Sequence, residues 1–494
     1  MKKIYPIDWK KTHPDNMAMS TDRYYVDLAN KVLNVLQSSG IEEVFPDDET
    51  IFDTALRLTA WFEDICSQLG FWRTVNETCQ QRYGKPLPFY DTTEYYPGEP
   101  NPQDIQLLLW DIIQSLNDDR FINPENPGIL WTANEIYKIF DEEYETAPET
   151  GEMIEYFADP AIGTDYWQTR RAFEWLSKNG YMSLHSSAIL ADALINYMNT
   201  NERPGNEGIL YAMVLGHVMC DRHNLLSLTA PEWLSAATRR PFTLDTSRLI
   251  NRYYTIEARY ATTLQIRDKI TDEDFIVEED SFDEGWFAQY GNQQGLAISC
   301  GIVSFNDKTY QAGTMVTYSD ARKIEDGMEK LRQEDYRKSL GKSNYDLFYE
   351  ASGGHDIVFL RGATALREFY TQKAGITLTP DFERQLEEAV YDKNRDGYAA
   401  VMATRDQGFL IISLSIPAIK SPDNPYYDAE YAKKHAHDLM LCSDAIDYSA
   451  ACLLLQKGYL ADAALTSLQG YEHGRQLLQN NAQFVVDYMF AQHQ

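Results

Sequence analysis

Apolar residues recur at helical spacing through the first half of the chain. Between Asp22 and Ser39 they fall on one side of a helix, with Thr21 as its cap and Gly40 as its stop. Further on, apolar residues stand alternately four and three positions apart, which predicts a helix over 48–69. Other helices are predicted over 104–116, 132–140, 165–179, 186–198, 206–223 and 245–269. The pattern therefore indicates a helical N-terminal domain.

The pattern changes to short apolar runs in the second half of the chain. Strands are predicted over 296–305, 314–318 and 356–360, alternating with helices over 320–340 and 380–389. The clearest hairpin has arms at 398–404 and 409–416, joined by a turn that ends in Gly408. Further helices follow it. The expected fold is mainly α with an α+β C-terminal part, in which a small mixed sheet is flanked by helices.

An acidic segment separates these two patterns. Residues 271–285 carry eight carboxylates in fifteen positions, and like charges at that density resist close packing. We therefore predict a helical domain over 1–270, an acidic linker over 271–285, and an α+β domain ending in helices over 286–494.

Charge narrows the range of partners. The chain has 44 basic and 75 acidic side chains, a formal net charge of −31, and residues 1–150 alone carry 12 basic and 27 acidic ones. Such a surface repels phosphate backbones, so direct binding to nucleic acid is not expected. The charge is compatible with a basic protein partner, with mimicry of DNA, or with solubility alone.

Cysteine usage and hydropathy indicate the compartment. The six cysteines lie far apart and form no CxxC pair, which disfavours a disulfide framework or a zinc ribbon. The first nine residues lack the apolar run of a signal peptide, and no stretch approaches the roughly 20 apolar residues that span a bilayer. We expect a cytoplasmic protein without membrane contact. No cofactor motif is complete, so no cofactor is expected, and the oligomeric state is left open.

The first candidate site is a metal site at His217, Cys220 and Asp221. These residues stand at i, i+3 and i+4 of a predicted helix, where imidazole, thiolate and carboxylate could meet one zinc ion. The neighbouring residues are apolar almost all round, and a fourth ligand is lacking. The competing interpretation is a core histidine that is hydrogen-bonded to Asp221, with Cys220 as a small apolar residue.

Catalytic chemistry is considered at two histidines and a cysteine. His435 and His437 lie on a predicted helix, where they would stand about 200° apart and share no metal ion. His435, on the inward stripe, could act alone as a general base. Cys300 could be a thiol nucleophile with His355 as its partner, although a cysteine on an apolar strand is more often structural.

Residues 392–397 have the opening of a calcium loop. Asp392, Asn394 and Asp396 show the DxNxDG spacing, with glycine at the sharp turn. The bidentate carboxylate at the twelfth position is missing, because that residue is Ala403. A turn stabilised by the Asp and Asn side chains is the alternative interpretation.

Arginines are concentrated just before the acidic segment. Arg248, Arg252 and Arg259 would share one face of the helix predicted over 245–269. They could hold a phosphate or carboxylate ligand. The competing interpretation is that they pair with the carboxylates of residues 272–284 in the same chain.

Three groups of residues carry a resemblance to a known family. They are Ile4-Tyr5 through Trp9 and His13-Pro14 with Asp22-Arg23-Tyr24-Tyr25; Asn424-Pro425-Tyr426-Tyr427 with Tyr431-Ala432 and His435-Ala436; and Tyr471-Glu472-His473-Gly474. Together they resemble an uncharacterised family of cytoplasmic proteins of the Bacteroidales type, known only as a domain of unknown function. The resemblance covers most of the chain and implies no activity, substrate or catalytic residue.

These observations favour a binding or interaction protein that presents an acidic surface to a basic partner. One alternative is a hydrolase or metal-assisted enzyme with its site near His435 or at His217, Cys220 and Asp221. Another is a protein that mimics DNA through its carboxylates. The sequence alone leaves open whether the protein is an enzyme.

Overall fold

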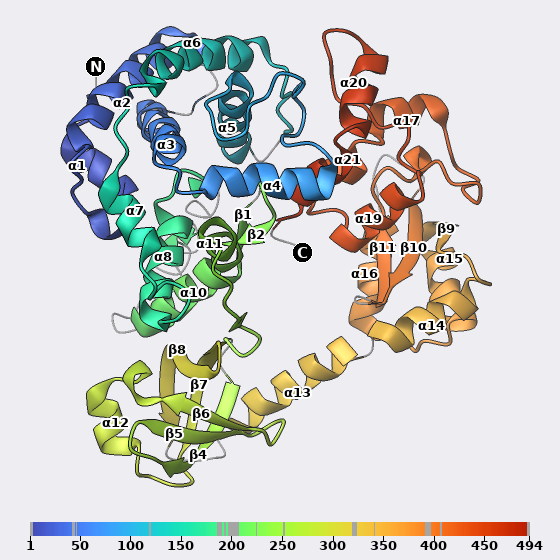
Figure 1. Ribbon diagram of the computed structural model, residues 1–494. Helices are drawn as coiled ribbons and strands as arrows, with labels where there is room; N and C mark the ends of the chain where they lie inside the picture. Colours follow the sequence, from blue (N-terminus) through green and yellow to red (C-terminus); the bar gives the residue numbers. More distant parts are fainter. Residues whose placement is uncertain are drawn as a thin grey trace. The chain divides into compact units, whose positions relative to one another are not determined.

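The chain of the computed structural model divides into two units, Met1–Leu331 and Arg332–Gln494, and Figure 1 traces the elements of each. The helical N-terminal half and the mixed C-terminal half are both present, but the sheets are distributed differently from the prediction. The structure describes residues 3–41, 45, 47–117, 120–184, 190–191, 194–195, 207–223, 225–249, 252–318, 324–339, 341–390, 397–405 and 408–491. The helix predicted over 186–198 therefore lies mostly outside the described residues.

The N-terminal part of unit 1 is helical, as the periodicity predicts. Its helices are α1 (Pro6–Trp9), α2 (Asp22–Ser38), α3 (Asp48–Ser67), α4 (Phe71–Tyr83), α5 (Pro102–Ser115), α6 (Pro127–Tyr144), α7 (Gly151–Ala158), α8 (Tyr166–Lys178), α10 (Glu207–Cys220) and α11 (Ala230–Thr238). Asp47 caps α3 by accepting a hydrogen bond from the Thr50 amide, and Gln68 ends the helix with a left-handed φ of 51°. α3 is buried over most of its surface and contacts α2, α4, α5 and α7.

Large aromatic side chains fill the core of this helical part. Phe62 of α3 stacks on Phe140 of α6 with ring centroids 4.5 Å apart, and Trp61 meets Trp72 edge to face at 6.0 Å. All four side chains are buried. Because aromatic residues bury large apolar areas, this cluster explains the close packing of α3, α4 and α6.

The helix predicted over 245–269 is wrong. These residues form two antiparallel strands, β4 (Arg252–Arg259) and β5 (Thr263–Asp268). Alternate side chains such as Tyr254 and Ile256 are buried. Aromatic and β-branched residues at a period of two favour a strand, and this pattern outweighs the wider spacing of the arginines.

The strands of unit 1 close into a five-stranded barrel. Besides β4 and β5 it contains β6 (Asp274–Glu278), β7 (Ala297–Phe305) and β8 (Lys308–Tyr318), while β3 (Leu244–Asp245) pairs with β7. Round the barrel the order is β4, β5, β6, β8, β7 and back to β4, with β6 and β8 parallel and the other neighbours antiparallel. A helix, α12 (Glu284–Tyr290), stands between the third and fourth strands of the barrel. This is the connectivity of an OB-fold.

The acidic segment over 271–285 is part of this barrel and not a linker. Its central residues form β6, in which Val277 is buried whereas Asp274 and Ile276 are exposed. Alternation along the strand lets carboxylates face the solvent while apolar side chains fill the barrel, so the charge density does not prevent packing. The division between the two units falls within α13 (Glu325–Ser339).

Unit 2 contains the predicted hairpin in a three-stranded antiparallel sheet. β10 (Tyr398–Thr404) is central, between β9 (Ile357–Arg361) and β11 (Gly408–Ile412). β11 ends at Ile412 and not at the predicted residue 416. Gly408 has a φ of 76°, the left-handed conformation that glycine adopts without strain. The sheet is small and flanked by helices, but it is antiparallel instead of mixed.

The helices of unit 2 lie before this sheet, between its first two strands and after it in sequence. They are α14 (Gly341–Ala351), α15 (Gly362–Glu368), α16 (Pro380–Val390), α17 (Ala429–His435), α18 (Asp438–Leu441), α19 (Tyr448–Gln456), α20 (Tyr471–Gln479) and α21 (Ala482–Met489). Phe348 of α14 and Leu386 of α16 pack in one apolar core with Val401 of β10. Across the described parts of both units, no helix combines the length and the apolar character needed to cross a membrane.

Candidate functional site

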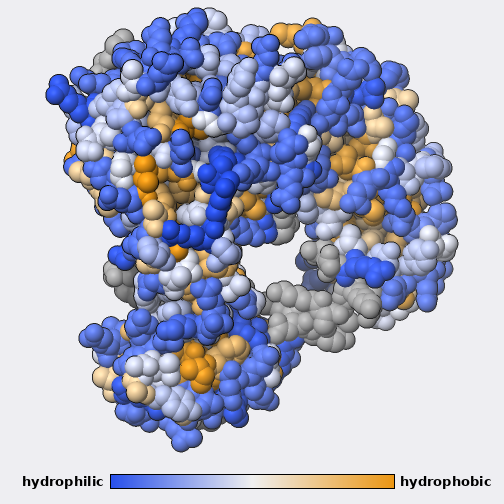
Figure 2. All heavy atoms as spheres, in the orientation of Figure 1, coloured by the Kyte–Doolittle hydropathy of each residue, from blue (hydrophilic) through white to orange (hydrophobic). Residues whose placement is uncertain are grey.

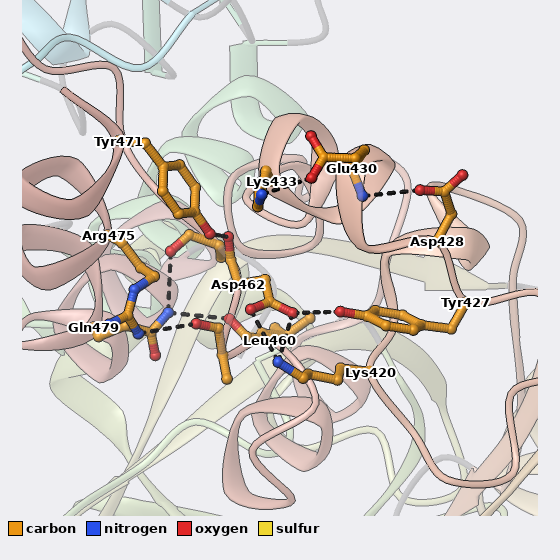
Figure 3. Close-up of polar contacts among 12 residues, drawn as sticks. Lys420, Tyr427, Asp428, Glu430, Lys433, Leu460, Asp462, Tyr471, Arg475 and Gln479 are labelled. Carbon is orange, nitrogen blue, oxygen red and sulfur yellow. Dashed lines mark hydrogen bonds and ion pairs between the residues drawn. The ribbon is translucent and has the colours of Figure 1, made fainter.

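A network of polar side chains surrounds Asp462 in unit 2 (Figure 3). The Asp462 carboxylate accepts a hydrogen bond from the Tyr427 hydroxyl at 2.7 Å and lies 3.0 Å from Lys420 Nζ. Burial alone would raise the pKa of Asp462, but these two donors outweigh it and hold the pKa below its ordinary value. Burial and the neighbouring carboxylate raise the pKa of Tyr427 to about 12. Tyr427 therefore stays protonated and donates to a charged Asp462.

Helix α20 holds the backbone on either side of Asp462. The Tyr471 hydroxyl donates to the Asp462 carbonyl at 2.8 Å, and Gln479 Nε2 donates to the Leu460 carbonyl at 3.0 Å. Gly474 lies so close to the chain that a Cβ atom there would be 1.9 Å from the Leu465 carbonyl oxygen. The segment Tyr471-Glu472-His473-Gly474 thus has a packing reason for both its tyrosine and its glycine.

The segment before α17 approaches Asp462 from the other side in Figure 3. Asn424 Nδ2 donates to the carbonyls of Ile416 and Ile419, at 2.9 and 2.8 Å, which fixes the turn. Asp428 caps α17 by accepting hydrogen bonds from the Glu430 and Tyr431 amides. These contacts position Tyr427 so that its hydroxyl reaches the Asp462 carboxylate.

The cations of this network are already paired with carboxylates. Lys420 faces Asp462, Lys433 lies 2.6 Å from Glu430, and Arg475 lies 2.6 Å from Glu472. Each of these three cations has a carboxylate partner, and the lowered pKa of Asp462 makes its carboxylate a weak proton acceptor. The role of this network in the fold is to join α17 and α20 to the loop after α19.

His435 and His437 do not point apart as predicted. The helix breaks between α17 and α18, so that both rings approach the Asp438 carboxylate, at 3.3 Å from His435 Nδ1 and 3.4 Å from His437 Nε2. The Ser415 hydroxyl donates to the same carboxylate at 3.0 Å. Burial lowers the pKa of His437, and its buried Nδ1 has no hydrogen-bond partner among the described residues. His435 Nδ1 is thus oriented by Asp438, as a general base would require.

His217 and Asp221 are brought together, but not as a metal site. His217 Nδ1 lies 2.7 Å from Asp221 Oδ2, and this hydrogen bond raises the pKa of His217. Cys220 is exposed. The predicted histidine–aspartate hydrogen bond is confirmed, although His217 is partly exposed and not a core residue. The residues that the structure describes include no group of three histidine, cysteine or carboxylate side chains able to hold a metal ion.

Cys300 and His355 belong to different units. Cys300 of β7 is fully buried in the apolar core of the barrel, together with Phe287 of α12, and burial raises its pKa to about 12. A thiol with such a pKa is not ionised near neutral pH, so it lacks the character of a nucleophile. His355 is exposed and lies 3.1 Å from Asp423 Oδ2.

The three arginines pair within the chain. Arg248 Nη1 and Arg252 Nε contact the buried Asp268 carboxylate at 2.9 and 3.0 Å. Arg248 also pairs with Glu273, and Arg259 lies 3.6 Å from Glu279. The predicted pairing with residues 272–284 is therefore confirmed for Arg248 and Arg259.

The third predicted cluster, Asp392, Asn394 and Asp396, lies outside the described residues. The structure therefore does not test the calcium loop. Gly397, which follows it, has a φ of 59°, and a Cβ atom there would lie 2.5 Å from the Val390 carbonyl oxygen. Glycine is required at this position by the close approach of two backbone segments.

A cavity of about 670 Å³ opens in unit 1, between α1, α3 and the end of α8. Its volume suits a small molecule. Its wall includes Arg57, whose Nη1 donates to the carbonyls of Gly180 and Tyr181 and whose Nε pairs with Asp53. The Arg57 guanidinium is thus largely engaged by the protein.

Sequence reasoning missed the buried polar groups of unit 1. His13 Nε2 lies 3.1 Å from Glu63 Oε2, and Thr150 donates to the other carboxylate oxygen at 2.5 Å. Asp104 is fully buried and accepts hydrogen bonds from Trp72 Nε1 at 2.9 Å and the Tyr95 hydroxyl at 2.6 Å. Burial raises the pKa of Asp104 to about 7. The sequence feature that indicates such a buried group is an acidic residue inside an apolar helical stripe, as at Glu63 in α3.

Comparison with known proteins gives a family without an activity. The model of a family described as "Protein of unknown function (DUF3843)" matches residues 3–280 and 306–491. No curated protein matches, and no solved structure matches. The predicted resemblance to a domain of unknown function is confirmed at the level of the family, without a source organism.

Proposed function

We propose, given that the chain belongs to the DUF3843 family of unknown function, that this protein is a binding protein whose unit 1 takes a basic partner. The proposal combines the distribution of charge with the state of the polar clusters. The charged side chains of those clusters are mostly paired within the protein, which directs attention to the surface as the place for a partner. On the face drawn in Figure 2, hydrophilic residues predominate and apolar residues form small islands.

The observation that carries the proposal is the unequal charge of the two units. Unit 1 has 28 basic and 53 acidic side chains, a net charge of −25, whereas unit 2 has 16 and 22, a net charge of −6. A field of this sign raises the association rate of a cationic partner and repels nucleic acid. Unit 1 is about twice as long as unit 2, so the net negative charge per residue of unit 1 is about twice that of unit 2.

The end of α6 supports the proposal. Asp141, Glu142 and Glu145 are exposed there, and the last turn contains no basic residue. Carboxylates at a helix C-terminus are repelled by the helix dipole, at a cost of up to about 1 kcal/mol each. A basic partner would remove this repulsion. Trp131 is exposed on the same face about three turns earlier, where its ring can receive a cation.

The other hypotheses have less support. A DNA mimic is the special case in which the basic partner is a DNA-binding protein, and the same charge supports it. A hydrolase at His435 is disfavoured because the Ser415 hydroxyl, which shares the Asp438 carboxylate with His435, is buried and donates to that carboxylate instead of to the histidine. A cytoplasmic location is supported by six free cysteines.

The test measures binding of a fluorescent lysine decapeptide at low and at high salt. The variant D141N/E142Q/E145Q removes the three exposed carboxylates at the end of α6. The matched control E350Q/E368Q/D444N removes three exposed carboxylates of unit 2. We expect the first variant to bind about tenfold more weakly and the control to bind like the wild type. Equal losses in both variants, or binding that salt does not weaken, would contradict the proposal.

A further inference from the structure

The outer surface of the barrel presents a face made by β5 and β6. Along β5, Leu264, Ile266 and Asp268 are buried, whereas Gln265 and Arg267 between them are partly exposed. Successive side chains of a strand point to opposite faces, so the partly exposed residues share the outer face. The buried Asp268 carboxylate pairs with Arg248 and Arg252. The outer face therefore does not have to supply partners for this charge.

Cross-strand neighbours form an apolar centre on this face. Ala258 of β4 lies opposite Gln265, and Gln265 lies opposite Ile276 of β6. Tyr260, between β4 and β5, donates from its hydroxyl to Gln265 Oε1 at 3.0 Å. Tyr260 is 53% exposed and Ile276 is 47% exposed. Ala258, Tyr260, Gln265 and Ile276 are called the barrel patch below.

Charged side chains border the barrel patch on two sides. Arg267 and Asp274 face each other across the strands, with 2.8 Å between Nε and Oδ1. Glu278 lies 3.5 Å from Lys308. Exposed ion pairs contribute little to stability, so the charges of a partner can replace them at small cost. An apolar centre inside a polar rim is the arrangement of protein–protein interfaces.

The barrel topology places this patch where OB-folds bind extended chains. In those proteins an oligonucleotide or oligosaccharide lies across the second and third strands, beside the loops between the first and second and between the fourth and fifth strands. The corresponding elements are β5, β6 and the loop that contains Tyr260. A closed ring of strands fixes the backbone, so the patch is pre-organised and loses little conformational entropy on binding.

Charge selects among the possible occupants. Residues 244–318 carry 6 basic and 12 acidic side chains, which disfavours an oligonucleotide. A second copy of the chain would bring two units of net charge −25 together, which is also unfavourable. A basic polypeptide satisfies both the apolar centre and the acidic surroundings.

We propose that the barrel patch binds a basic polypeptide segment. One apolar side chain of the segment lies against Tyr260 and Ile276, and its lysine or arginine side chains contact Asp274 and Glu278. The inference rests on the proposed function for the charge of the partner, and it adds the place and the apolar contact.

The test compares two lysine-rich nonapeptides that differ only in the central residue, leucine or serine. We expect the wild-type protein to bind the leucine peptide about tenfold more tightly, because burial of one aliphatic side chain is worth at least this much. The variant I276T should lose this preference. The matched control V316T changes another exposed β-branched residue of the same barrel, 43% exposed on β8, and should keep the preference.

Hydrogen exchange gives a second measurement on the wild-type chain. The leucine peptide should slow exchange at residues 263–267 and 274–278 and leave β10 unchanged. If I276T keeps the preference, or if these strands show no protection, the docking site is wrong while the binding function stands through the serine peptide. If neither peptide binds the wild-type protein at low salt, both proposals are wrong.

Discussion

The two units place their carboxylates differently. Unit 1 buries Glu63, Asp64, Asp104 and Asp268 in addition to the acidic residues on its surface. Among the described residues of unit 2, Asp487 is the one buried carboxylate, and groups such as Asp462 are partly exposed and paired with a lysine. Unit 2 therefore satisfies its charges at the surface, while unit 1 depends on hydrogen bonds inside its core.

This difference shows that the carboxylates of the chain act in two physically different ways. A buried carboxylate requires donors and is sensitive to protonation, because desolvation disfavours its charged form. An exposed carboxylate costs little and acts at a distance on partners. The stability of unit 1 should therefore depend on pH through its buried carboxylates. Its binding to a partner should depend on salt through its exposed carboxylates.

The largest effect is expected from Gly474→Ala in unit 2. The added Cβ would lie 1.9 Å from the Leu465 carbonyl oxygen, so α20 must move away from the loop that it holds. We expect a loss of about 3 kcal/mol in the free energy of unfolding, measured by urea unfolding and located in unit 2 by hydrogen exchange. Gly151→Ala is the control, because no atom lies within 4 Å of its Cβ position. Equal losses in both variants would show that the contact is not tight.

The second-largest effect is expected from Asp104→Asn, which should weaken the pH dependence of the free energy of unfolding of unit 1. The folded pKa of about 7 lies above the ordinary value, so between these values the folded state holds a proton that the unfolded chain has released. The free energy of unfolding should then fall as the pH rises through about 4 to 7, by an amount on the order of a few kcal/mol. D104N should flatten this slope.

The measurement for Asp104 is urea unfolding over the same pH range. Asp487→Asn, the buried carboxylate of unit 2, is the matched control and should keep the wild-type slope. A D104N protein with an unchanged slope would exclude Asp104 as the source of the pH dependence.

The smallest effect is expected at the end of α6. In D141N/E142Q/E145Q, repulsion between the carboxylates and the dipole of α6 is reduced, so the unfolding free energy should rise by about 0.5 kcal/mol at low salt. High salt should remove the gain. Thermal unfolding at two salt concentrations measures it. A loss of stability would indicate that these carboxylates support the fold instead of serving a partner.

The sequence predicted the elements whose periodicity is local. α2, α3 and β10 appear close to their predicted ends, because amphipathic spacing and caps are carried by neighbouring residues. The barrel is not predicted because Arg248, Arg252 and Arg259 stand at a helical spacing that competes with the alternation of Tyr254 and Ile256. The closure of a ring of strands depends on distant residues, which no local pattern contains.

The same distinction between local and long-range contacts applies to the candidate sites. The contact between His217 and Asp221 was predictable, because both lie on one helix four positions apart. The network around Asp462 was not, because it joins Lys420, Tyr427 and Tyr471 across breaks between helices. The break after His435 likewise brings the two histidines to one carboxylate instead of pointing them apart.

The closed barrel also constrains the order of events during synthesis. β4, β5 and β6 are neighbours in sequence and can pair as soon as they emerge, but β4 meets its other neighbour only when β7 has been made. Until then β4 and β6 each present an unpaired edge, which is a template for association with other chains. The carboxylates of residues 271–285 are translated in this interval, where their mutual repulsion would keep nascent chains apart.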